Sequence, residues 1–210
     1  MTTSDPAAAP ADDFDDRRSQ ILRAALDVIS HRGYSDTRVA DVALRAGISP
    51  ALVMYYFQTK DRLLVEATRL AEDLWYQHGN RRLEAIPSAT ARLEELVRLT
   101  CLPQEDPAMG ESWAVWLDLW AQAAHWPEVA AVREEFDEHW RETIRALVRG
   151  GQADGEFDPV DVDYVAISLS AVLDGLAIQL ALHDPVVTAQ RAFDVAMMLA
   201  ARLLGFSWQA

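Results

Sequence analysis

Residues 39–60 carry small, branched and hydroxyl-bearing side chains at the spacing of a helix-turn-helix. Ala43 is small enough for two helices to cross closely, Gly47 suits a left-handed turn, and Val53 supplies a branched apolar contact between the helices. The second helix of such a pair, here residues 50–56, enters the major groove of DNA in helix-turn-helix proteins. The spacing therefore predicts a nucleic-acid-binding motif.

A second group of residues has the chemistry of a binding cavity. Residues 111–126 hold four of the seven tryptophans, and Trp113, Trp116 and Trp120 share one helix face because they recur at i, i+3 and i+7. The group either lines an aromatic cavity or packs in the core, and core packing is the commoner use of such a stripe. Further aromatic side chains lie in flanking helical segments: Trp75, Tyr76, Phe136 and Trp140.

Asp174 interrupts an apolar segment, residues 164–182, that is long enough to span a bilayer. Gln179 interrupts it again, and no Lys or Arg stands at its ends to anchor it at a membrane surface. We therefore expect a helix buried between other helices and no membrane association. Asp174 is then a candidate buried acid at a functional site.

The sequence contains no motif for catalysis, metal binding or a cofactor. The five histidines lack the HExxH spacing of a zinc site, and no glycine-rich phosphate loop or GxSxG nucleophile motif occurs. Cys101 is the single cysteine, which excludes an internal disulfide, and no histidine lies close to it in sequence to activate it. We expect a non-enzymatic protein of the reducing cytoplasm.

The charge of the chain is divided unevenly. The net charge of −14 argues against nucleic-acid binding, because phosphate contacts depend on Lys and Arg. Between Arg17 and Arg62, however, eight basic residues stand against four acidic ones, whereas residues 63–210 carry 11 basic and 24 acidic side chains. A small basic module, net +4, is therefore joined to a strongly acidic body, net −13.

Helical periodicity recurs along nearly the whole chain, and we expect an all-α protein. Gly33 ends the first helix, and Thr37 or Asp36 caps the second. Ser49 and Pro50 form a cap and first-turn pair for the third. The helices are predicted at about 16–31, 38–46, 50–56, 60–80, 88–101, 108–124, 127–150, 160–183 and 186–204.

Three segments follow from this pattern. Residues 1–15 are rich in Pro, Ala and Asp and are predicted to form a disordered acidic tail. Residues 16–62 form the three-helix, helix-turn-helix domain, and residues 63–210 form the helical body.

Residues 17–64 resemble the DNA-binding domain of the TetR family of transcriptional regulators. The match runs in order through the Gly33-Tyr34 pair, Thr37, the Asp-Val-Ala of the second helix, the Ala-Gly-Ile-Ser turn and the segment YYFQTKDRLL at 55–64. Members of this family are homodimeric regulators, mostly repressors, in which a C-terminal helical body binds small ligands. The resemblance implies the same organisation for this chain.

The resemblance also assigns DNA contacts to particular residues. Hydroxyl groups and Lys60 suit phosphate, whereas the start of the third helix lies nearest the bases. Positions 40, 51, 52 and 54 often carry polar or aromatic residues in relatives but are Ala, Ala, Leu and Met here. We expect apolar contact with thymine methyls and DNA shape to contribute, and the alternative is that Leu52 packs inward. The residues expected at the DNA are Thr37, Arg38, Arg45, Ser49, Pro50, Ala51, Leu52, Tyr55, Tyr56 and Lys60.

The acidic body resembles the C-terminal domain of the choline-sensing, BetI-like members of the same family. The resemblance rests on the tryptophan-containing helix, the segment WRETIRALVRGGQADGEFDP at 140–159 and the Asp-Gly pair at 174–175. It implies a small-molecule site, and aromatic faces beside an acid suit a cationic ligand through cation–π attraction. The expected ligand-binding residues are Trp75, Trp113, Trp116, Asp118, Trp120, Phe136 and Trp140.

In this family the last two helices form a four-helix interface between two copies. The resemblance therefore favours Asp174 as a hydrogen-bond acceptor at the dimer interface over a ligand role, with Gly175 and Ala177 allowing close approach. The expected interface residues are Asp174, Gly175, Ala177, Met197 and Leu204.

The leading hypothesis is a homodimeric transcriptional repressor that binds a near-palindromic DNA operator and is released by a small-molecule ligand in the C-terminal body. No cofactor is expected. The alternative is a helical protein-interaction scaffold that has kept the fold without specific DNA binding, because helix 50–56 has few polar residues.

Overall fold

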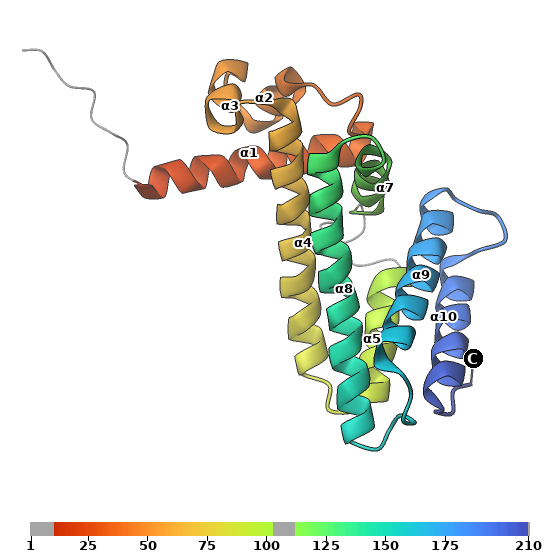
Figure 1. The fold of residues 1–210 in the computed structure, drawn as a ribbon. Coiled ribbons are helices and arrows are strands. Elements are labelled where there is room, and N and C mark those ends of the chain that lie inside the picture. Colours follow the sequence, from red (N-terminus) through yellow and green to blue (C-terminus); the bar gives the residue numbers. More distant parts are fainter. Residues whose placement is uncertain (1–10, 103–111, 210) are drawn as a thin grey trace, which may run out of the picture. The chain divides into compact units, whose positions relative to one another are not determined.

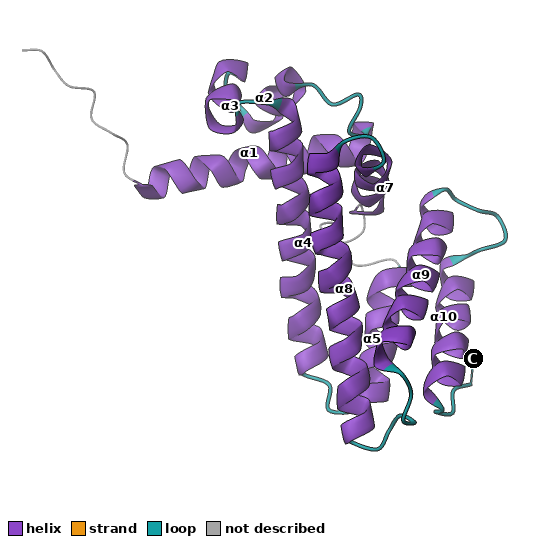
Figure 2. Ribbon diagram, in the orientation of Figure 1, coloured by secondary structure: helices purple, strands orange, loops and turns teal. Residues whose placement is uncertain are grey.

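The computed structural model describes residues 11–102 and 112–209, with side chains from Asp15 onward in the first range and from Val115 onward in the second. Within these ranges all regular structure is helical and no strand occurs, which confirms the all-α prediction there (Figures 1 and 2). The helices are α1 (Ala11–Arg32), α2 (Val39–Ala46), α3 (Pro50–Phe57), α4 (Lys60–Glu84), α5 (Ala89–Cys101), α7 (Ser112–Ala123), α8 (Pro127–Ala153), α9 (Val162–Ala181) and α10 (Ala189–Leu204).

The chain divides into two compact units between Ala71 and Glu72. The division lies inside α4, so this single helix contributes to both units. The sequence places the domain boundary earlier, between residues 62 and 63, at the start of the same helix.

The first unit is a three-helix module followed by the start of α4. α1 packs against α2, and α2 packs against α3. Ile21, Val42 and Val53, one from each helix, are completely buried at its centre. Gly33 and Gly47 have φ values of 78° and 69° and end α1 and α2 as predicted, because glycine adopts this left-handed conformation without strain.

The start of α1 differs from the prediction. The helix begins at Ala11, so residues 11–15, expected in the disordered tail, are helical. Four of the residues from 12 to 16 are aspartates, and acidic residues are favoured near the start of a helix because they complement the positive end of its dipole.

The start of α2 also differs. Its N-cap is Arg38, which makes no side-chain cap, so the prediction of Thr37 or Asp36 is wrong. The backbone N–H of Arg38 instead donates to Oδ2 of Asp41 at 3.3 Å. The Thr37 hydroxyl donates to the carbonyl oxygen of Gly33, in the loop before the helix. The predicted cap of α3 is confirmed: Oγ of Ser49 accepts the N–H of Leu52 at 3.2 Å.

The second unit has a core built by α5, α8, α9 and α10. α8 packs against α7 and α9, and α10 packs against α5 and α9. Leu96, Ile144 and Met197 are completely buried members of this core. At the end of α8, a Cβ on Gly151 would come within 2.1 Å of the Phe157 ring, so this close approach requires glycine.

α9 is long and apolar enough to cross a membrane, judged by its length and composition alone. One face of the helix is packed into the core of the second unit, as expected for a helix buried between others. The buried residues are Val165, Ala166, Leu169, Ser170, Leu173, Leu176 and Ala177.

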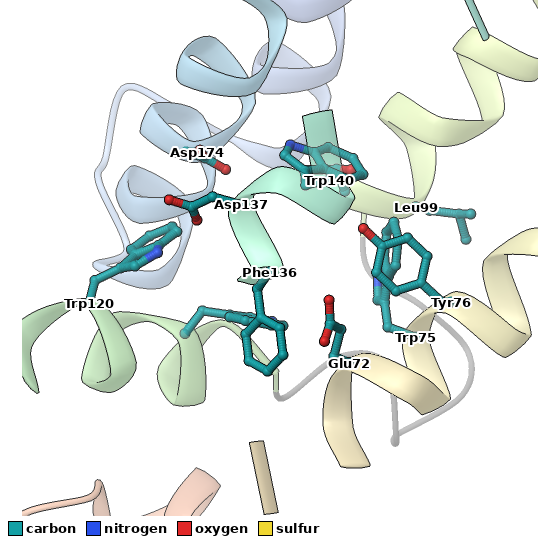
Figure 3. A pocket seen from close by; sticks show the side chains of 11 residues that line it. Glu72, Trp75, Tyr76, Leu99, Trp120, Phe136, Asp137, Trp140 and Asp174 are labelled. Carbon is teal, nitrogen blue, oxygen red and sulfur yellow. The ribbon is translucent and has the colours of Figure 1, made fainter. Parts of the chain in front are cut away.

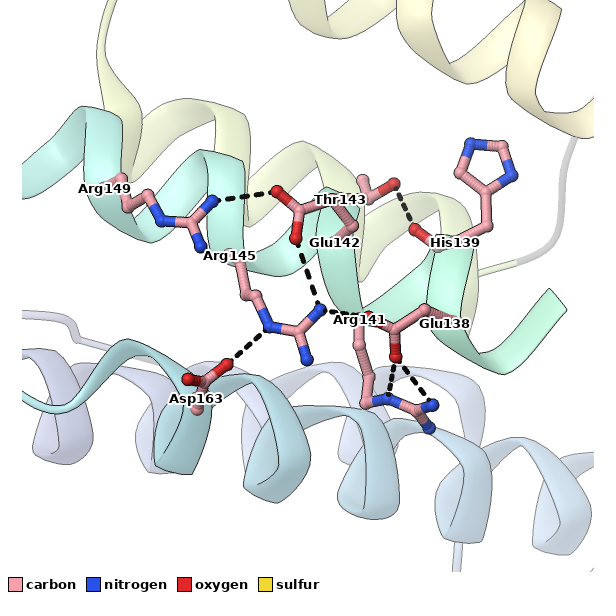
Figure 4. A network of polar contacts seen from close by, with 8 residues as sticks. All are labelled: Glu138, His139, Arg141, Glu142, Thr143, Arg145, Arg149 and Asp163. Atoms are coloured by element: carbon pink, nitrogen blue, oxygen red, sulfur yellow. Dashed lines mark hydrogen bonds and ion pairs between the residues drawn. The ribbon is translucent and has the colours of Figure 1, made fainter. Parts of the chain in front are cut away.

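A network of ion pairs joins α8 to α9 (Figure 4). Arg145 of α8 donates to Asp163, in the first turn of α9, at 2.6 Å. The same guanidinium group donates to Glu138 at 2.8 Å and to Glu142 at 3.2 Å within its own helix. Only 13% of the Arg145 side chain is exposed, so solvent screens its charge less than that of a typical surface arginine. The pair with Asp163 is the contact of this network that links α8 to α9.

Candidate nucleic-acid interface and ligand cavity

α3 has one buried face and one exposed face. Val53 and Phe57 are completely buried and fasten the helix to its own unit. On the other side, Met54 and Tyr55 are 38% and 71% exposed. The first turn is accessible as well, and its exposed residues are Ser49, Pro50 and Ala51.

Leu52 lies between these two faces and is half-buried, so its side chain is divided between packing and solvent. The hydrogen-bonding side chains of α3 are those of Tyr55 and Tyr56, whose rings meet edge to face with centroids 5.6 Å apart. The helix therefore offers apolar groups and phenol hydroxyls to DNA, and no amide or guanidinium group.

Lys60 begins α4 and is held beside the loop between α1 and α2. Its Nζ donates to the carbonyl oxygen of Ser35 at 3.2 Å and lies 5.4 Å from the centre of the Tyr34 ring. The Tyr34 hydroxyl donates to Oδ1 of Asp61 at 2.9 Å, and burial, followed by this hydrogen bond, raises the pKa of Tyr34. The ammonium group is therefore positioned by contacts within the module, as a phosphate-binding lysine requires.

Thr37 is placed differently from the other predicted DNA contacts. Its side chain is 1% exposed, and its hydroxyl donates to the carbonyl oxygen of Gly33 at 2.7 Å. A direct phosphate contact would require this hydrogen bond to break. In the structure, Thr37 closes the loop between α1 and α2.

The two predicted arginines are both exposed. Arg38 stands at the start of α2. Arg45 forms an ion pair with Asp27 of α1, and this contact with Arg45 is the main cause that lowers the pKa of Asp27. Arg45 therefore already carries a structural contact inside the module.

The second unit contains a cavity of about 90 Å³ (Figure 3). Four helices supply its aromatic and acidic wall: α4, α7, α8 and α9. The lining residues are Glu72, Trp75, Tyr76, Leu99, Thr100, Trp116, Trp120, Phe136, Asp137, Trp140 and Asp174.

The aromatic rings of the cavity pack edge to face. Trp75 and Trp140 have ring centroids 5.5 Å apart, and Trp116 and Phe136 have centroids 5.4 Å apart. These arrangements fix the orientation of the rings. The indole N–H of Trp140 is buried and has no hydrogen-bond acceptor in the described part of the chain.

Three carboxylates face the same cavity. Oε1 of Glu72 lies 3.2 Å from Nδ1 of His139, and Asp137 forms a 3.0 Å ion pair with Arg133. Burial is the main cause that raises the pKa of Glu72 and of Asp137. Burial, with a smaller contribution from Asp137, raises the pKa of Asp174 to about 6.

Most of the predicted ligand-binding residues line this cavity. Trp75, Trp116, Trp120, Phe136 and Trp140 are in its wall, whereas Asp118 is not. Trp113 belongs to α7, but its side chain lies outside the described residues.

Sequence reasoning missed two of the three acids of the cavity, Glu72 and Asp137. Asp174 is a sequence-predicted buried acid for which the resemblance favours a dimer interface over a ligand role, and the structure places it in the cavity wall. Glu72 stands three residues before Trp75, and Asp137 three residues before Trp140, so each shares a helix face with a predicted aromatic residue. That spacing was the available signal.

The predicted dimer residues are mostly internal. Ala177, Met197 and Leu204 are completely buried in the core of a single protomer, so they cannot contact a second copy without rearrangement. In the protomer these three residues lie on the core faces of α9 and α10, and their assignment to a dimer interface stays a prediction. Gly175 is half-buried, with open space where a Cβ would project. The large apolar residues exposed on α9 and α10 are Tyr164, Ile167 and Met198.

Two family models match the chain. The model described as bacterial regulatory proteins, tetR family, matches residues 21–67, and the model described as BetI-type transcriptional repressor, C-terminal, matches residues 89–205. The two matches cover the helix-turn-helix and most of the second unit.

Curated relatives are similar over part or most of their length. An HTH-type transcriptional regulator BetI from Burkholderia thailandensis is 30% identical over 166 residues, which cover 76% of this chain and 79% of that protein. A regulator of the same name from Paraburkholderia phymatum is 36% identical over 112 residues, 53% of this chain and 56% of that protein. The match therefore spans only about half the length of the second relative.

Solved structures show the same fold. A putative transcriptional regulator from Saccharomonospora viridis, in complex with choline, has a TM-score of 0.81 and 30% identity, covering 90% of this chain and 98% of that one. A putative TetR-family transcriptional regulator from Rhodococcus sp. has a TM-score of 0.78 and 25% identity, and the match covers 90% of this chain and 99% of that one.

Proposed function

This chain belongs to the tetR family of bacterial regulatory proteins, with a C-terminal domain of the BetI type, and from that premise we propose that it is a ligand-released repressor. It acts in the cytoplasm as a homodimer and binds a near-palindromic operator. It leaves the operator when a small organic cation occupies the cavity of the second unit.

The observation that carries the ligand part of this proposal is the composition of the cavity wall. Six aromatic side chains and three carboxylates surround the cavity. Both kinds of group attract cations, through the negative face of the ring and through direct charge. Choline, which is bound by the similar regulator from Saccharomonospora viridis, is therefore the probe of choice.

The DNA part of the proposal rests on the first unit. Its net charge of +4 between Arg17 and Arg62 supports phosphate binding, and the first turn of α3 is exposed as a recognition helix requires. A dimer presents two copies of α3 to half-sites about one DNA turn apart, roughly 34 Å. This geometry requires an operator with two-fold symmetry.

α4 supplies the physical route between the two sites. Lys60 stands at its start, and Glu72, Trp75 and Tyr76 of the same helix line the cavity. A ligand that binds more tightly when α4 is in one of two placements shifts the population of molecules toward that placement. The shift is no larger than the difference between the ligand's binding free energies for the two placements. Release of DNA follows when the favoured position does not match the operator.

A gel-shift experiment tests both parts. The probe is the DNA upstream of the chain's own gene, at low salt, with and without choline chloride. We expect the wild type to retard the DNA and choline to release it. Tyr55→Ala should bind about 10- to 100-fold more weakly, because it loses a hydrogen bond to a charged phosphate oxygen worth about 1.5–3 kcal/mol.

Trp126→Ala is the matched control, because Trp126 is an exposed aromatic residue of the second unit that does not line the cavity. It should bind DNA like the wild type. Failure of the wild type to retard any fragment at low salt would contradict the repressor proposal. Retardation that choline leaves unchanged would contradict the choice of ligand alone.

A further inference from the structure

The three carboxylates of the cavity differ in how their charge is balanced. Glu72 has the ring nitrogen of His139 at 3.2 Å, and Asp137 has the guanidinium group of Arg133 at 3.0 Å. Asp174 accepts a hydrogen bond from the neutral hydroxyl of Ser170 at 3.3 Å and forms no ion pair with any described residue. Asp174 is therefore the acid of this cavity that has neither an imidazole nor a guanidinium group within ion-pair distance among the described residues.

The surroundings of Asp174 make its negative charge costly in the absence of a cation. It lies on α9, beside the completely buried Leu173 and close to Asp137 of α8 (Figure 3). Burial and the charge of Asp137 disfavour its ionised form, while Ser170 and the more distant Arg141 favour it, and its pKa is about 6. Glu72, on α4, adds a third acid to the same cavity.

A cation entering this cavity would meet different conditions at each acid. At Glu72 it would compete with His139, and at Asp137 with Arg133. At Asp174 it would displace no ion pair and would relieve the repulsion from Asp137. The indole of Trp120 and the ring of Phe136 lie in the same part of the wall and can cover the apolar surface of the cation (Figure 3).

We propose that Asp174 is the counter-ion that makes the cavity select an organic monocation over an uncharged molecule of the same shape. This inference rests on the proposed function, in which the cavity binds an organic cation. Asp174 supplies charge discrimination, and the aromatic wall supplies affinity that does not depend on charge. The two contributions are separable by experiment.

The test compares two probes of nearly equal shape, choline and its uncharged carbon analogue 3,3-dimethyl-1-butanol, by calorimetry at pH 7.5. The wild type should bind choline at least tenfold more tightly than the alcohol. Asp174→Asn should lose most of this preference while its affinity for the alcohol changes little. Asp73→Asn removes one charge from the exposed side of α4, next to the cavity helices but outside the wall, and should keep the preference.

A pH series gives a second readout. Choline keeps its charge at every pH, so its affinity for the wild type should fall as the pH is lowered from 7.5 to 5 and Asp174 takes up its proton. Asp174→Asn should show only the weaker dependence that Glu72 and Asp137 impose. The variant is expected to fold, because asparagine can still accept the Ser170 hydroxyl, and an unchanged gel shift verifies this.

The outcomes are distinguishable. Choline binding by Asp174→Asn with an undiminished preference over the alcohol overturns the role of Asp174 and leaves the proposed function intact. Absence of choline binding by the wild type contradicts the choice of ligand and overturns this inference with it.

Discussion

Thr37 has a different role in the structure from the one that the family resemblance implies. The family resemblance assigns it to phosphate, whereas the structure buries it and directs its hydroxyl to the carbonyl oxygen of Gly33. A residue that shapes the loop and a residue that binds phosphate affect DNA binding differently. The loop residue changes the stability of the module, and the phosphate contact changes the affinity of the folded module for DNA.

Thr37→Val distinguishes these roles, because valine keeps the shape of threonine and removes the hydroxyl. We expect the free energy of unfolding to fall by about 1 kcal/mol, the typical value of one hydrogen bond. The affinity of the folded variant for DNA should stay unchanged. Arg38→Ala, at an exposed position, should weaken DNA binding and reduce the slope of log K against log salt concentration by about 1. A loss of DNA affinity in Thr37→Val without a loss of stability would restore its phosphate role.

The candidate sites were only partly predictable at this scale. Aromatic residues such as Trp116 and Trp120 were recognised because three tryptophans recur on one helix face. The acids Glu72 and Asp137 were missed because their importance depends on which faces of four helices converge. Helical periodicity along one segment does not contain that information.

At the scale of the helices, capping and turn residues in the sequence predict several helix boundaries accurately. Ser49, Pro50 and Gly47 signal the start of α3 and the end of α2, and the structure confirms both. The start of α1 was predicted five residues late, at Asp16 instead of Ala11, because the Pro-, Ala- and Asp-rich composition of residues 1–15 also favours a disordered tail. Local signals therefore predict helix ends well only where a specific residue forces them.

The start of α5 depends on a contact that no local signal reveals. Oε2 of Glu156 accepts the Ser88 hydroxyl at 2.7 Å and the N–H of Thr90 at 2.9 Å, and Oε1 accepts the N–H of Ala89 at 2.8 Å. These hydrogen bonds, led by that from Thr90, lower the pKa of Glu156 to about 2. The carboxylate therefore completes the cap that Ser88 begins.

Glu156→Gln should lower the Tm at pH 7 by a few degrees, because an amide accepts fewer hydrogen bonds than a carboxylate. The folded-state pKa lies below the ordinary value of 4.5, so this contribution is present above about pH 4.5 and is lost as the pH falls toward 2. Melting curves of both proteins at pH 7 and pH 3 measure the difference. Asp154→Asn, at an exposed neighbouring acid, is the control, and a Tm difference that is equal at both pH values would contradict the interpretation.

At the scale of the whole molecule, residues 17–62 and residues 63–210 carry opposite net charges and therefore suit different binding partners. Residues 17–62 carry a net +4 and attract phosphate, whereas residues 63–210 carry a net −13 and repel it. The acidic body therefore leaves the helix-turn-helix as the basic surface for DNA. Its own candidate contact with a second copy is apolar, through Tyr164, Ile167 and Met198.

Ile167→Glu tests the proposed dimer, because a charge placed in an apolar interface leaves an unpaired group buried there. Light scattering at micromolar concentration should give the wild type about twice the protomer mass of 23.4 kDa and the variant about one protomer mass. Leu44→Glu, at an 82% exposed position on α2, should remain dimeric. A wild-type mass of one protomer would remove the dimer from the proposed function.

The Glu156 contact also has a consequence for the order in which the chain acquires its structure. The carboxylate is supplied 66 to 68 residues after the groups that it binds. At a synthesis rate of about 5–20 residues per second, the ribosome adds Glu156 roughly 3–13 s after the start of α5. During that interval the nascent helix has only its local cap from Ser88. Glu156, three residues after the end of α8, therefore completes the cap of α5 only after α7 and α8 have been synthesised.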